Sequence, residues 1–235
     1  LYAASVEREI GKYASYPYVM ALDGTILALL DNPRDSMQRY RVDSYLEALN
    51  DRIGTLDVFL LDRTGRVIAS SNWNKWDSLV GRDLSYRPYY QNAGVGRLTR
   101  FYGIGTTNLQ PGYFLATAIV RDNDTLGIGV VKVSLEQLER SWASAESPAI
   151  LSDEHGVVVL SSVPAWKYGT LVALDDKAHR EIAEAQQYND RSLAPIGLST
   201  LRDLDGDTRI VRLPGAAGSD SCFSPEWLFL SHSLA

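Results

Sequence analysis

The chain contains 235 residues, of which 45% are hydrophobic, 22% are charged and 10% are aromatic. This composition is typical of a folded globular protein and excludes a disordered, collagen-like or low-complexity chain, and the length allows one large domain or two small ones. The net charge is −6 and the basic residues are scattered, so we expect no nucleic-acid partner. The longest apolar runs are shorter than the roughly 18 residues of a spanning helix.

Residues 1–54 predict a helical N-terminal region. Apolar residues recur there at helical spacing, and Pro17 interrupts the first stretch. Asp35 or Ser36 is the predicted N-cap of the second stretch, and Gly54 stands where a left-handed residue commonly ends a helix. The chain therefore begins with a long helical segment.

Short runs rich in β-forming residues follow, separated by turn residues. Between residues 58 and 135 these predicted strands are VFLLD, RVIASS, TRFYGIG, GYFLATAIV and GIGVVKVSL. A helix is expected from Leu135 to Ser144, and Pro148 begins a new unit. This unit is expected to contain a helix around Asp175 to Tyr188 and the strands LSTLRDL, TRIVRL and WLFLS.

An internal repeat indicates two related modules. Residues 58–71 align without gaps on residues 149–162 at an offset of 91, and six of the fourteen positions match, whereas chance would give about one. Each copy predicts a strand, a tight turn and a second strand, with Gly65 or Gly156 free to adopt a positive φ. We therefore predict an α/β fold of the α+β kind, with two modules in tandem.

Sequence signatures of enzymes and metal sites are absent. The chain has no G-x-S-x-G, P-loop, H-E-x-x-H or C-x-x-C motif, and its three histidines lie far apart. Cys222 is interpreted as a buried or incidental thiol and not as a nucleophile. Residues 203–208, DLDGDT, are interpreted as a hairpin turn, because Gly206 is fourth where a calcium loop needs glycine sixth. We predict no catalytic residue, no metal site and no cofactor.

Lys132 is a candidate binding residue because of its apolar surroundings. By strand alternation it shares one face with Ile128 and Val130, while Val131 and Val133 share the other. An ammonium group that emerges from an apolar face needs an anionic partner. A bound anion and an internal Asp or Glu both remain open as that partner.

Arg87 is the second candidate. It lies in Tyr86-Arg87-Pro88-Tyr89-Tyr90, where Pro88 fits the first turn of a helix and the rings could form the wall of a pocket. Its guanidinium group matches a carboxylate bidentately, although a surface arginine stacked on tyrosine is the alternative. Thr106 and Thr107 add hydroxyls and backbone amides in a glycine-flanked loop that suits a second carboxylate, although taken alone they would form only a polar turn.

The stretches NWNKWDSLVGRDLSYRPYYQNA, RFYGIGTTNLQPGYFLA and GVVKVSLEQLE, whose motifs are concentrated in residues 58–138, resemble one known family. They are similar to the membrane-distal half of the double Cache sensor domain of C4-dicarboxylate sensor histidine kinases of the DctB type. The tandem repeat and the helical start agree with it, so the resemblance covers essentially the whole chain. It implies a periplasmic ectodomain between transmembrane helices, with a long N-terminal helix and two PAS-like modules, each built on an antiparallel sheet.

The resemblance also implies domain limits and a site. Residues 1–54 would be the N-terminal helical region, residues 55–147 the membrane-distal ligand-binding module and residues 148–235 the membrane-proximal module. The implied ligand-binding residues are Arg87, Lys132, Thr106, Thr107, Tyr86, Ser85 and Gly105. The expected partners are a small organic acid and a second copy of the chain, which would form a homodimer through the N-terminal helix.

Leu84 departs from the tyrosine that this family carries three residues before the arginine. The loss of one hydroxyl contact, worth roughly 0.5 to 1.5 kcal/mol, leaves the identity of the acid open. The expected function is a sensor for a C4-dicarboxylate such as succinate, malate or fumarate, and a bulkier acid or a monocarboxylate is the alternative ligand. A chemoreceptor ectodomain and a ligandless dimerisation module are the alternative functions.

Overall fold

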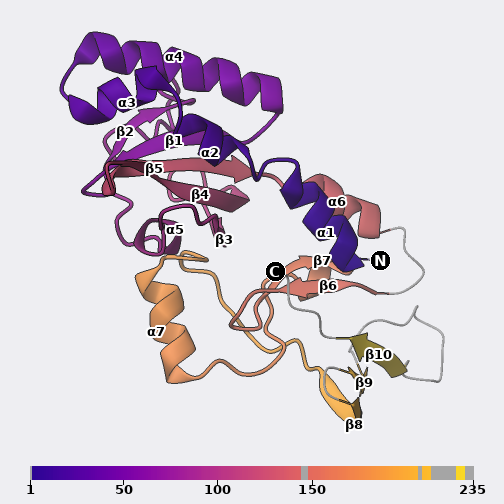
Figure 1. The fold of residues 1–235 in the computed structure, drawn as a ribbon. Helices are drawn as coiled ribbons and strands as arrows, with labels where there is room; N and C mark the ends of the chain where they lie inside the picture. Colours follow the sequence, from indigo (N-terminus) through magenta and orange to yellow (C-terminus); the bar gives the residue numbers. More distant parts are fainter. Residues whose placement is uncertain (1, 144–147, 206–207, 213–225, 231–235) are drawn as a thin grey trace. The chain divides into compact units, whose positions relative to one another are not determined.

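The structure is a computed structural model that describes residues 2–143, 148–205, 208–212 and 226–230 (Figure 1). The chain divides into two compact units. One consists of Glu9–Leu135 and Ile182–Asn189, and the other of Leu1–Arg8, Glu136–Glu181 and Asp190–Ala235. We call Ile182–Asn189 the return segment, because it belongs to the first unit although its neighbours in sequence belong to the second. This division into units does not test the predicted domain limits at residues 54 and 147, and these limits stay predictions.

The N-terminal region is helical, as predicted, and it is divided into several helices. These are α1 (Tyr2–Gly11), α2 (Tyr16–Met20), α3 (Gly24–Asp31) and α4 (Ser36–Ile53). Asp35 caps α4 by accepting a hydrogen bond from the backbone N–H of Gln38 at 2.9 Å. Gly54 ends α4 in the left-handed conformation, with φ 69° and ψ 38°. Both predicted ends of this helix are therefore confirmed.

A five-stranded antiparallel sheet forms the centre of the first unit, with strand order β2-β1-β5-β4-β3 (Figure 1). All five strands predicted in this region are present. Their bounds are β1 (Asp57–Asp62), β2 (Val67–Ser70), β3 (Thr99–Ile104), β4 (Pro111–Arg121) and β5 (Asp124–Val133). The short helix α5 (Pro88–Gln91) lies between β2 and β3 in sequence.

The two faces of this sheet are both buried, against different partners. On one face, side chains of β1 and β5 such as Leu60 and Val131 pack against α2, α3 and α4. On the other face, Phe59 and Val130 pack with residues of the β2–β3 connection, among them Tyr89. This alternation follows from the two-residue period of a strand. A single polar residue in β1 or β5 can therefore place its side chain on the second face while its neighbours in the strand remain in the apolar core.

The second unit contains α6 (Glu136–Trp142), β6 (Ile150–Ser152), β7 (Val158–Ser161), a 3₁₀ turn (Pro164–Trp166), α7 (Asp176–Glu184, which ends in the return segment), β8 (Ser199–Asp205), β9 (Thr208–Arg212) and β10 (Glu226–Leu230). Within the described residues, its strands form one two-stranded and one three-stranded antiparallel sheet. Asp205 pairs with Thr208, which confirms a hairpin at DLDGDT. The predicted helix and strand ends at Ser144, Leu213 and Ser231 lie outside the described residues, as does Cys222.

The two hairpins of the internal repeat share their hydrogen bonds. The Ser71 hydroxyl accepts from the backbone N–H of Val58 at 2.9 Å, and the Ser162 hydroxyl accepts from that of Ala149, also at 2.9 Å. In the turns, the carboxylates of Asp62 and Asp153 each accept two backbone N–H groups at the same relative positions. Both hairpins also contain a register irregularity at equivalent residues. The predicted repeat is thus confirmed as one local structure formed twice.

No helix in the described ranges combines the length and the apolar character that crossing a bilayer requires.

Candidate functional site

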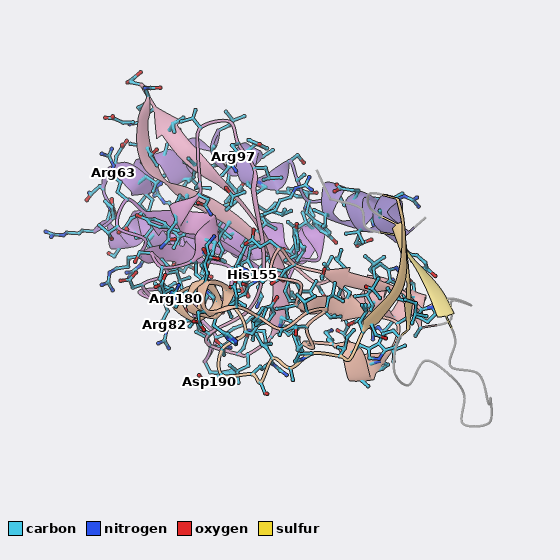
Figure 2. All side chains as sticks on the ribbon, turned by 90° about the horizontal axis from the view of Figure 1, so that it is seen from below. Arg63, Arg82, Arg97, His155, Arg180 and Asp190 are labelled. Carbon is cyan, nitrogen blue, oxygen red and sulfur yellow. The ribbon has the colours of Figure 1, made fainter. Side chains whose placement is uncertain are left out.

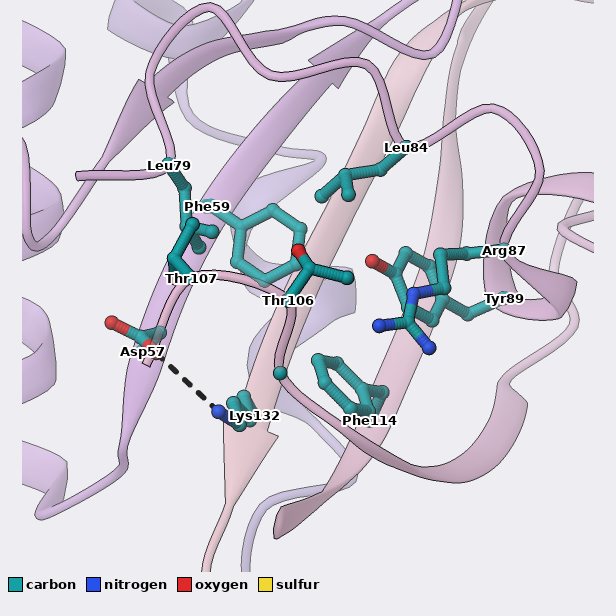
Figure 3. Close-up of a pocket in the computed structure, with 11 residues that line it drawn as sticks. Asp57, Phe59, Leu79, Leu84, Arg87, Tyr89, Thr106, Thr107, Phe114 and Lys132 are labelled. Carbon is teal, nitrogen blue, oxygen red and sulfur yellow. Dashed lines mark ion pairs between the residues drawn. The ribbon is translucent and has the colours of Figure 1, made fainter. Parts of the chain in front are cut away.

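A small cavity lies in the first unit, on the sheet face opposite α2, α3 and α4 (Figure 3). Its volume is about 20 Å³, which is room for roughly one water molecule. The residues that line it are Asp57, Phe59, Leu79, Leu84, Arg87, Tyr89, Gly105, Thr106, Thr107, Phe114 and Lys132. Five of the seven predicted binding residues line this cavity, namely Arg87, Gly105, Thr106, Thr107 and Lys132. Leu84 also lines it.

Arg87 lies at the start of α5, where Pro88 occupies the first helical turn as expected. Its side chain is 1% exposed. Nη1 donates to the backbone carbonyls of Ala185 and Gln186, both at 3.2 Å, and Nη2 donates to the carbonyl of Ile104 at 2.8 Å. Main-chain oxygens from two distant parts of the sequence therefore hold the guanidinium group in place.

The positive charge of Arg87 has no carboxylate partner among the described residues. Its three hydrogen-bond acceptors are neutral carbonyls, and its Nε is buried with no acceptor in the described part of the chain. The rings of Tyr86 and Phe101 lie 5.6 and 5.9 Å from Cζ and supply cation–π contacts. A buried guanidinium group with only neutral partners is a strong site for an anion.

Lys132 reaches the same cavity from the sheet and is 2% exposed. Its predicted face is confirmed, because Ile128 and Val130 pack on the cavity side and Val131 on the other. The aliphatic part of Lys132 passes over Gly112, where an added Cβ would lie 2.6 Å from Cε and 2.7 Å from Cγ. Glycine at this position of β4 thus gives the lysine its path to the cavity.

Asp57 faces Lys132, although no pattern in the sequence distinguishes it as a site residue. The two residues are register partners on β1 and β5, and Lys132 Nζ lies 3.9 Å from Asp57 Oδ2 (Figure 3). Burial raises the pKa of Asp57 to about 6, although Lys132 opposes this shift. Burial likewise lowers the pKa of Lys132, against the attraction of Asp57. Of the two partners left open for Lys132, the structure therefore contains an internal carboxylate.

The loop after β3 forms another wall of the cavity through Gly105, Thr106 and Thr107. The backbone N–H of Gly105 donates to the Gln110 carbonyl at 2.9 Å, which closes the loop on itself. Asn108 fastens it to the β2–β3 connection by donating to Asp77 Oδ2 at 3.0 Å. The two threonine residues are only half-buried, so this wall borders on solvent.

Ser85 and Tyr86, the other predicted binding residues, are not among the lining residues. The backbone N–H of Ser85 donates to the carboxylate of Asp83 at 3.0 Å. Tyr86 instead lies against the guanidinium group of Arg87. The site as a whole stays a prediction, with these two residues placed next to it.

The return segment is a further part of the site that the sequence did not indicate. The Gln187 carbonyl accepts from the backbone N–H of Ile104 at 2.8 Å, and Gln187 Nε2 donates to the carbonyl of Tyr102 at 3.1 Å. Tyr188 is fully buried, with its ring 6.4 Å from that of Tyr102. These contacts lie along β3, next to the carbonyls that hold Arg87. The residue pattern within the return segment does not indicate that it packs against the first unit.

No group of three or more His, Cys, Asp and Glu residues in the described part of the chain is arranged to hold a metal ion. The cavity instead combines two buried cations, a buried carboxylate, the hydroxyl-bearing side chains of Tyr89, Thr106 and Thr107, and several apolar side chains. Such a set suits binding of a small polar molecule that carries negative charge.

The chain is similar to two curated sensor proteins. It is 34% identical over 168 residues to the C4-dicarboxylate transport sensor protein DctB of Pseudomonas aeruginosa, which is 72% of this chain and 28% of that protein. It is 30% identical over 197 residues to the protein of the same name from Rhizobium meliloti, which is 83% of this chain and 31% of that protein. The chain thus spans less than a third of the length of these relatives. No protein-family model matches it.

Solved structures agree with these relatives. The sensor domain of the V. cholerae histidine kinase DctB superposes with a TM-score of 0.82 at 29% identity, covering 97% of this chain and 86% of that one. The ligand-binding domain of the Campylobacter jejuni chemoreceptor Tlp3, solved with 4-methylisoleucine, shares the fold at a TM-score of 0.57 and 19% identity, covering 70% of this chain and 68% of that one. The matched part of the V. cholerae kinase is its sensor domain, which is not the catalytic part. The chain therefore belongs to the DctB family of sensor proteins and is a sensor domain of that family.

Proposed function

We propose that this sensor domain binds a small organic acid, a C4-dicarboxylate such as succinate, malate or fumarate, on the outer side of a bacterial inner membrane. The whole protein would be a two-component histidine kinase, and binding would be signalled across the membrane. The names of the two curated relatives and of the V. cholerae sensor domain support this proposal. The periplasmic location and the attachment to transmembrane helices are parts of the same proposal.

The buried guanidinium group of Arg87 carries the argument for an anionic ligand. Its described hydrogen-bond partners are three neutral carbonyls, and Nε has none. Desolvation of a charge costs several kcal/mol unless a counter-charge compensates it. A ligand carboxylate would supply that counter-charge and accept charge-assisted hydrogen bonds, which are about twice as strong as neutral ones.

The other end of the cavity would hold the second carboxylate. Lys132 would donate from the sheet, and Thr106 and Thr107 would donate from the loop after β3. Gly105 allows close approach there, because an added Cβ would lie 3.0 Å from Lys132 Nζ. Two cationic ends separated by apolar side chains match a short chain with a carboxylate at each end.

Ligand entry requires the cavity to widen. A C4-dicarboxylate has about eight heavy atoms, whereas the cavity of about 20 Å³ holds roughly one water molecule. The loop after β3 is the wall suited to move, since it is half-exposed and is fastened through the Asn108 side chain. The structure corresponds in this proposal to a closed form, and the bound form has this loop displaced outward.

Leu84 determines which acids fit best. It lines the cavity with 4% exposure and presents a methyl surface where a hydroxyl would add a polar contact. A bulkier acid or a monocarboxylate loses less from this surface than succinate does. The proposed ligand class is therefore tested with acids of graded size and charge.

Titration calorimetry on the purified domain tests the proposal. Succinate, L-malate and fumarate should release or absorb heat at micromolar to millimolar concentrations, and acetate should give none. Arg87→Ala should weaken binding by about 10- to 100-fold, as expected for a lost charged hydrogen bond. Arg63→Ala is the matched control, because Arg63 is exposed on the turn between β1 and β2 and lies at the surface (Figure 2). Equal binding by wild type and Arg87→Ala would refute the assigned site.

A ligandless dimerisation module is the second candidate, and the Asp57–Lys132 pair favours it, because an internal carboxylate already faces the lysine. It predicts that no acid in the panel raises the melting temperature. The proposed homodimer through the N-terminal helices is common to both candidates. Light scattering of the domain with and without residues 1–11 measures whether these residues are needed for the dimer.

A further inference from the structure

The return segment touches the proposed ligand site through the main chain. The carbonyls of Ala185 and Gln186 accept both described hydrogen bonds of Arg87 Nη1. We propose that the return segment is the positioning and coupling element of this sensor: it holds one edge of the guanidinium group so that the opposite edge faces the ligand, and the ligand in turn stabilises the segment. This inference depends on the proposed function, because it assigns a role within the same site.

The two edges of the guanidinium group have different partners. Nη1 is bound to the return segment, whereas Nη2 makes one described bond, to the Ile104 carbonyl, and Nε makes none within the described residues. Nε and Nη2 lie on the same edge of an arginine and together form a planar pair of donors that matches a carboxylate. The carboxylate is therefore expected to bind this Nε–Nη2 edge.

The return segment is firmly attached to the first unit. Ile104 donates its backbone N–H to the Gln187 carbonyl at 2.8 Å, and the Gln187 side chain donates to the Tyr102 carbonyl at 3.1 Å. Ala185 is 7% exposed and Tyr188 is fully buried. Loss of these contacts would remove the acceptors of Nη1, and the guanidinium group would be free to turn away from the cavity.

The segment is joined by peptide bonds to the second unit at both of its ends. Residues up to Glu181 and residues from Asp190 onward belong to that unit. Gln186 and Asn189 have positive φ values of 48° and 52°, which are uncommon for residues other than glycine and mark a specific local conformation. A ligand that stabilises this conformation thereby acts on both chain connections to the other unit.

Hydrogen–deuterium exchange of the wild-type domain with and without succinate tests this coupling directly. If the ligand binds only when the segment is attached, opening of the segment is suppressed, and at about 100 times Kd exchange slows by up to about 100-fold. The amides to follow are those of the return segment and of Ile104, which donates to it. The amides of α4, on the opposite sheet face, serve as the internal reference.

Variants at Gln187 test positioning separately from folding. Gln187→Ala removes the bond to the Tyr102 carbonyl and should weaken succinate binding by about three- to tenfold. Gln91→Ala is the matched control, because Gln91 is exposed in the same unit. In an Arg87→Ala background, Gln187→Ala should cause no further loss of the residual affinity, which thermal shift at millimolar succinate can measure.

The outcomes separate this inference from the proposed function. Slowed exchange in the return segment relative to α4, together with a non-additive double variant, supports the inference. Calorimetric binding of succinate with unchanged exchange in the return segment, or additive losses in the double variant, overturns it and leaves the proposed function standing. No binding of any acid in the panel overturns the proposed function, and the inference with it.

Discussion

Asp57 and Lys132 are directly opposite each other on β1 and β5, and their side chains end in one buried cavity with 3.9 Å between Oδ2 and Nζ. This pair makes the proposed site sensitive to its own protonation state. An ionised Asp57 compensates the lysine and repels an incoming carboxylate, whereas a neutral Asp57 does neither. The charged groups that act on this pair are Arg87 in the same cavity and Asp77 and Lys75 on the connection after β2.

Binding of a dicarboxylate should therefore strengthen as the pH falls. The pKa of Asp57 is raised to about 6, so its negative charge is lost when the pH drops through that value. Lys132, whose pKa is lowered, keeps its charge better at low pH, which acts in the same direction. Calorimetry with fumarate between pH 5.5 and 8 measures this, since fumarate remains a dianion to lower pH than succinate.

Asp57→Asn should increase the affinity at pH 7.5 by up to about 100-fold, because one buried like charge at about 6 Å costs about 2.8 kcal/mol at an effective dielectric of about 20. The variant should also have a flatter pH profile between pH 5.5 and 7.5. Asp51→Asn, at an exposed position of α4, is the control and should keep the wild-type profile. Identical pH profiles of wild type and Asp57→Asn would contradict this role of Asp57.

Gly112→Ala should weaken binding of the acid by about tenfold with a smaller effect on stability. The added methyl would lie within 2.7 Å of the Lys132 side chain, which must bend away and carry its ammonium group out of position. Gly129→Ala on the adjacent strand is the control, because its Cβ would approach Met20 at 3.3 Å on the opposite sheet face. Calorimetry and thermal melting of both variants give the comparison, and equal affinities would contradict the assigned path of Lys132.

Asp43→Asn should stabilise the domain at neutral pH. Asp43 is buried on α4, its carboxylate accepts from the backbone N–H of Ser70 at 2.9 Å, and burial raises its pKa to about 6. A carboxyl with a raised pKa binds protons more tightly in the folded state, so stability falls as pH rises from about 4 to about 6. Asparagine keeps the acceptor oxygen and removes the buried charge.

The expected gain at pH 7.5 is about 3 kcal/mol, since the pKa rises from 3.8 to about 6 and a tenfold change in proton affinity corresponds to about 1.36 kcal/mol, and the gain should vanish near pH 4. Urea denaturation at the two pH values measures this difference. The charged groups near Asp43 are Arg39 and Glu47 on the same helix. A gain of equal size at both pH values would show that the charge of Asp43 is not its cause.

The turn glycines of the two repeat copies should respond differently to alanine. Gly65 and Gly156 have φ values of 82° and 78°, so both replacements strain the backbone by about 1 to 2 kcal/mol. An added Cβ at Gly65 would also lie 2.5 Å from Ser85 Cβ, whereas at Gly156 its nearest neighbour is Leu171 Cβ at 3.8 Å. Thermal melting should therefore show a larger loss for Gly65→Ala, and equal losses would exclude the close contact as the cause.

Local patterns were enough to predict much of this fold. The caps of α4 at Asp35 and Gly54, the strands of the first unit and the repeated hairpin all depend on residues close together in sequence. The face of Lys132 followed from alternation within a single strand. These features share one physical basis: they depend on the local backbone geometry of helices, strands and turns, which the nearby residues determine.

The remaining features depend on pairing between distant segments. Asp57 faces Lys132 because β1 pairs with β5 in one register; the alternating pattern of each strand constrains which face a residue occupies, but it does not specify which residue of the other strand lies opposite. The carbonyls of Ala185 and Gln186 near Arg87 come from a segment almost 100 positions away. Main-chain acceptors have no side-chain signature, so a sequence pattern cannot reveal them.

Every residue has a backbone carbonyl oxygen, so the hydrogen bonds of Arg87 tolerate changes of side chain at the residues that accept them. Point substitutions at Ala185 or Gln186 leave the oxygen atoms in place as long as the backbone keeps its path. The amino-acid identities there can drift during evolution while the arginine stays anchored. Insertions or deletions nearby shift the oxygens themselves, so natural selection would have to preserve the length of the segment, together with a residue at position 186 that tolerates a φ of 48°.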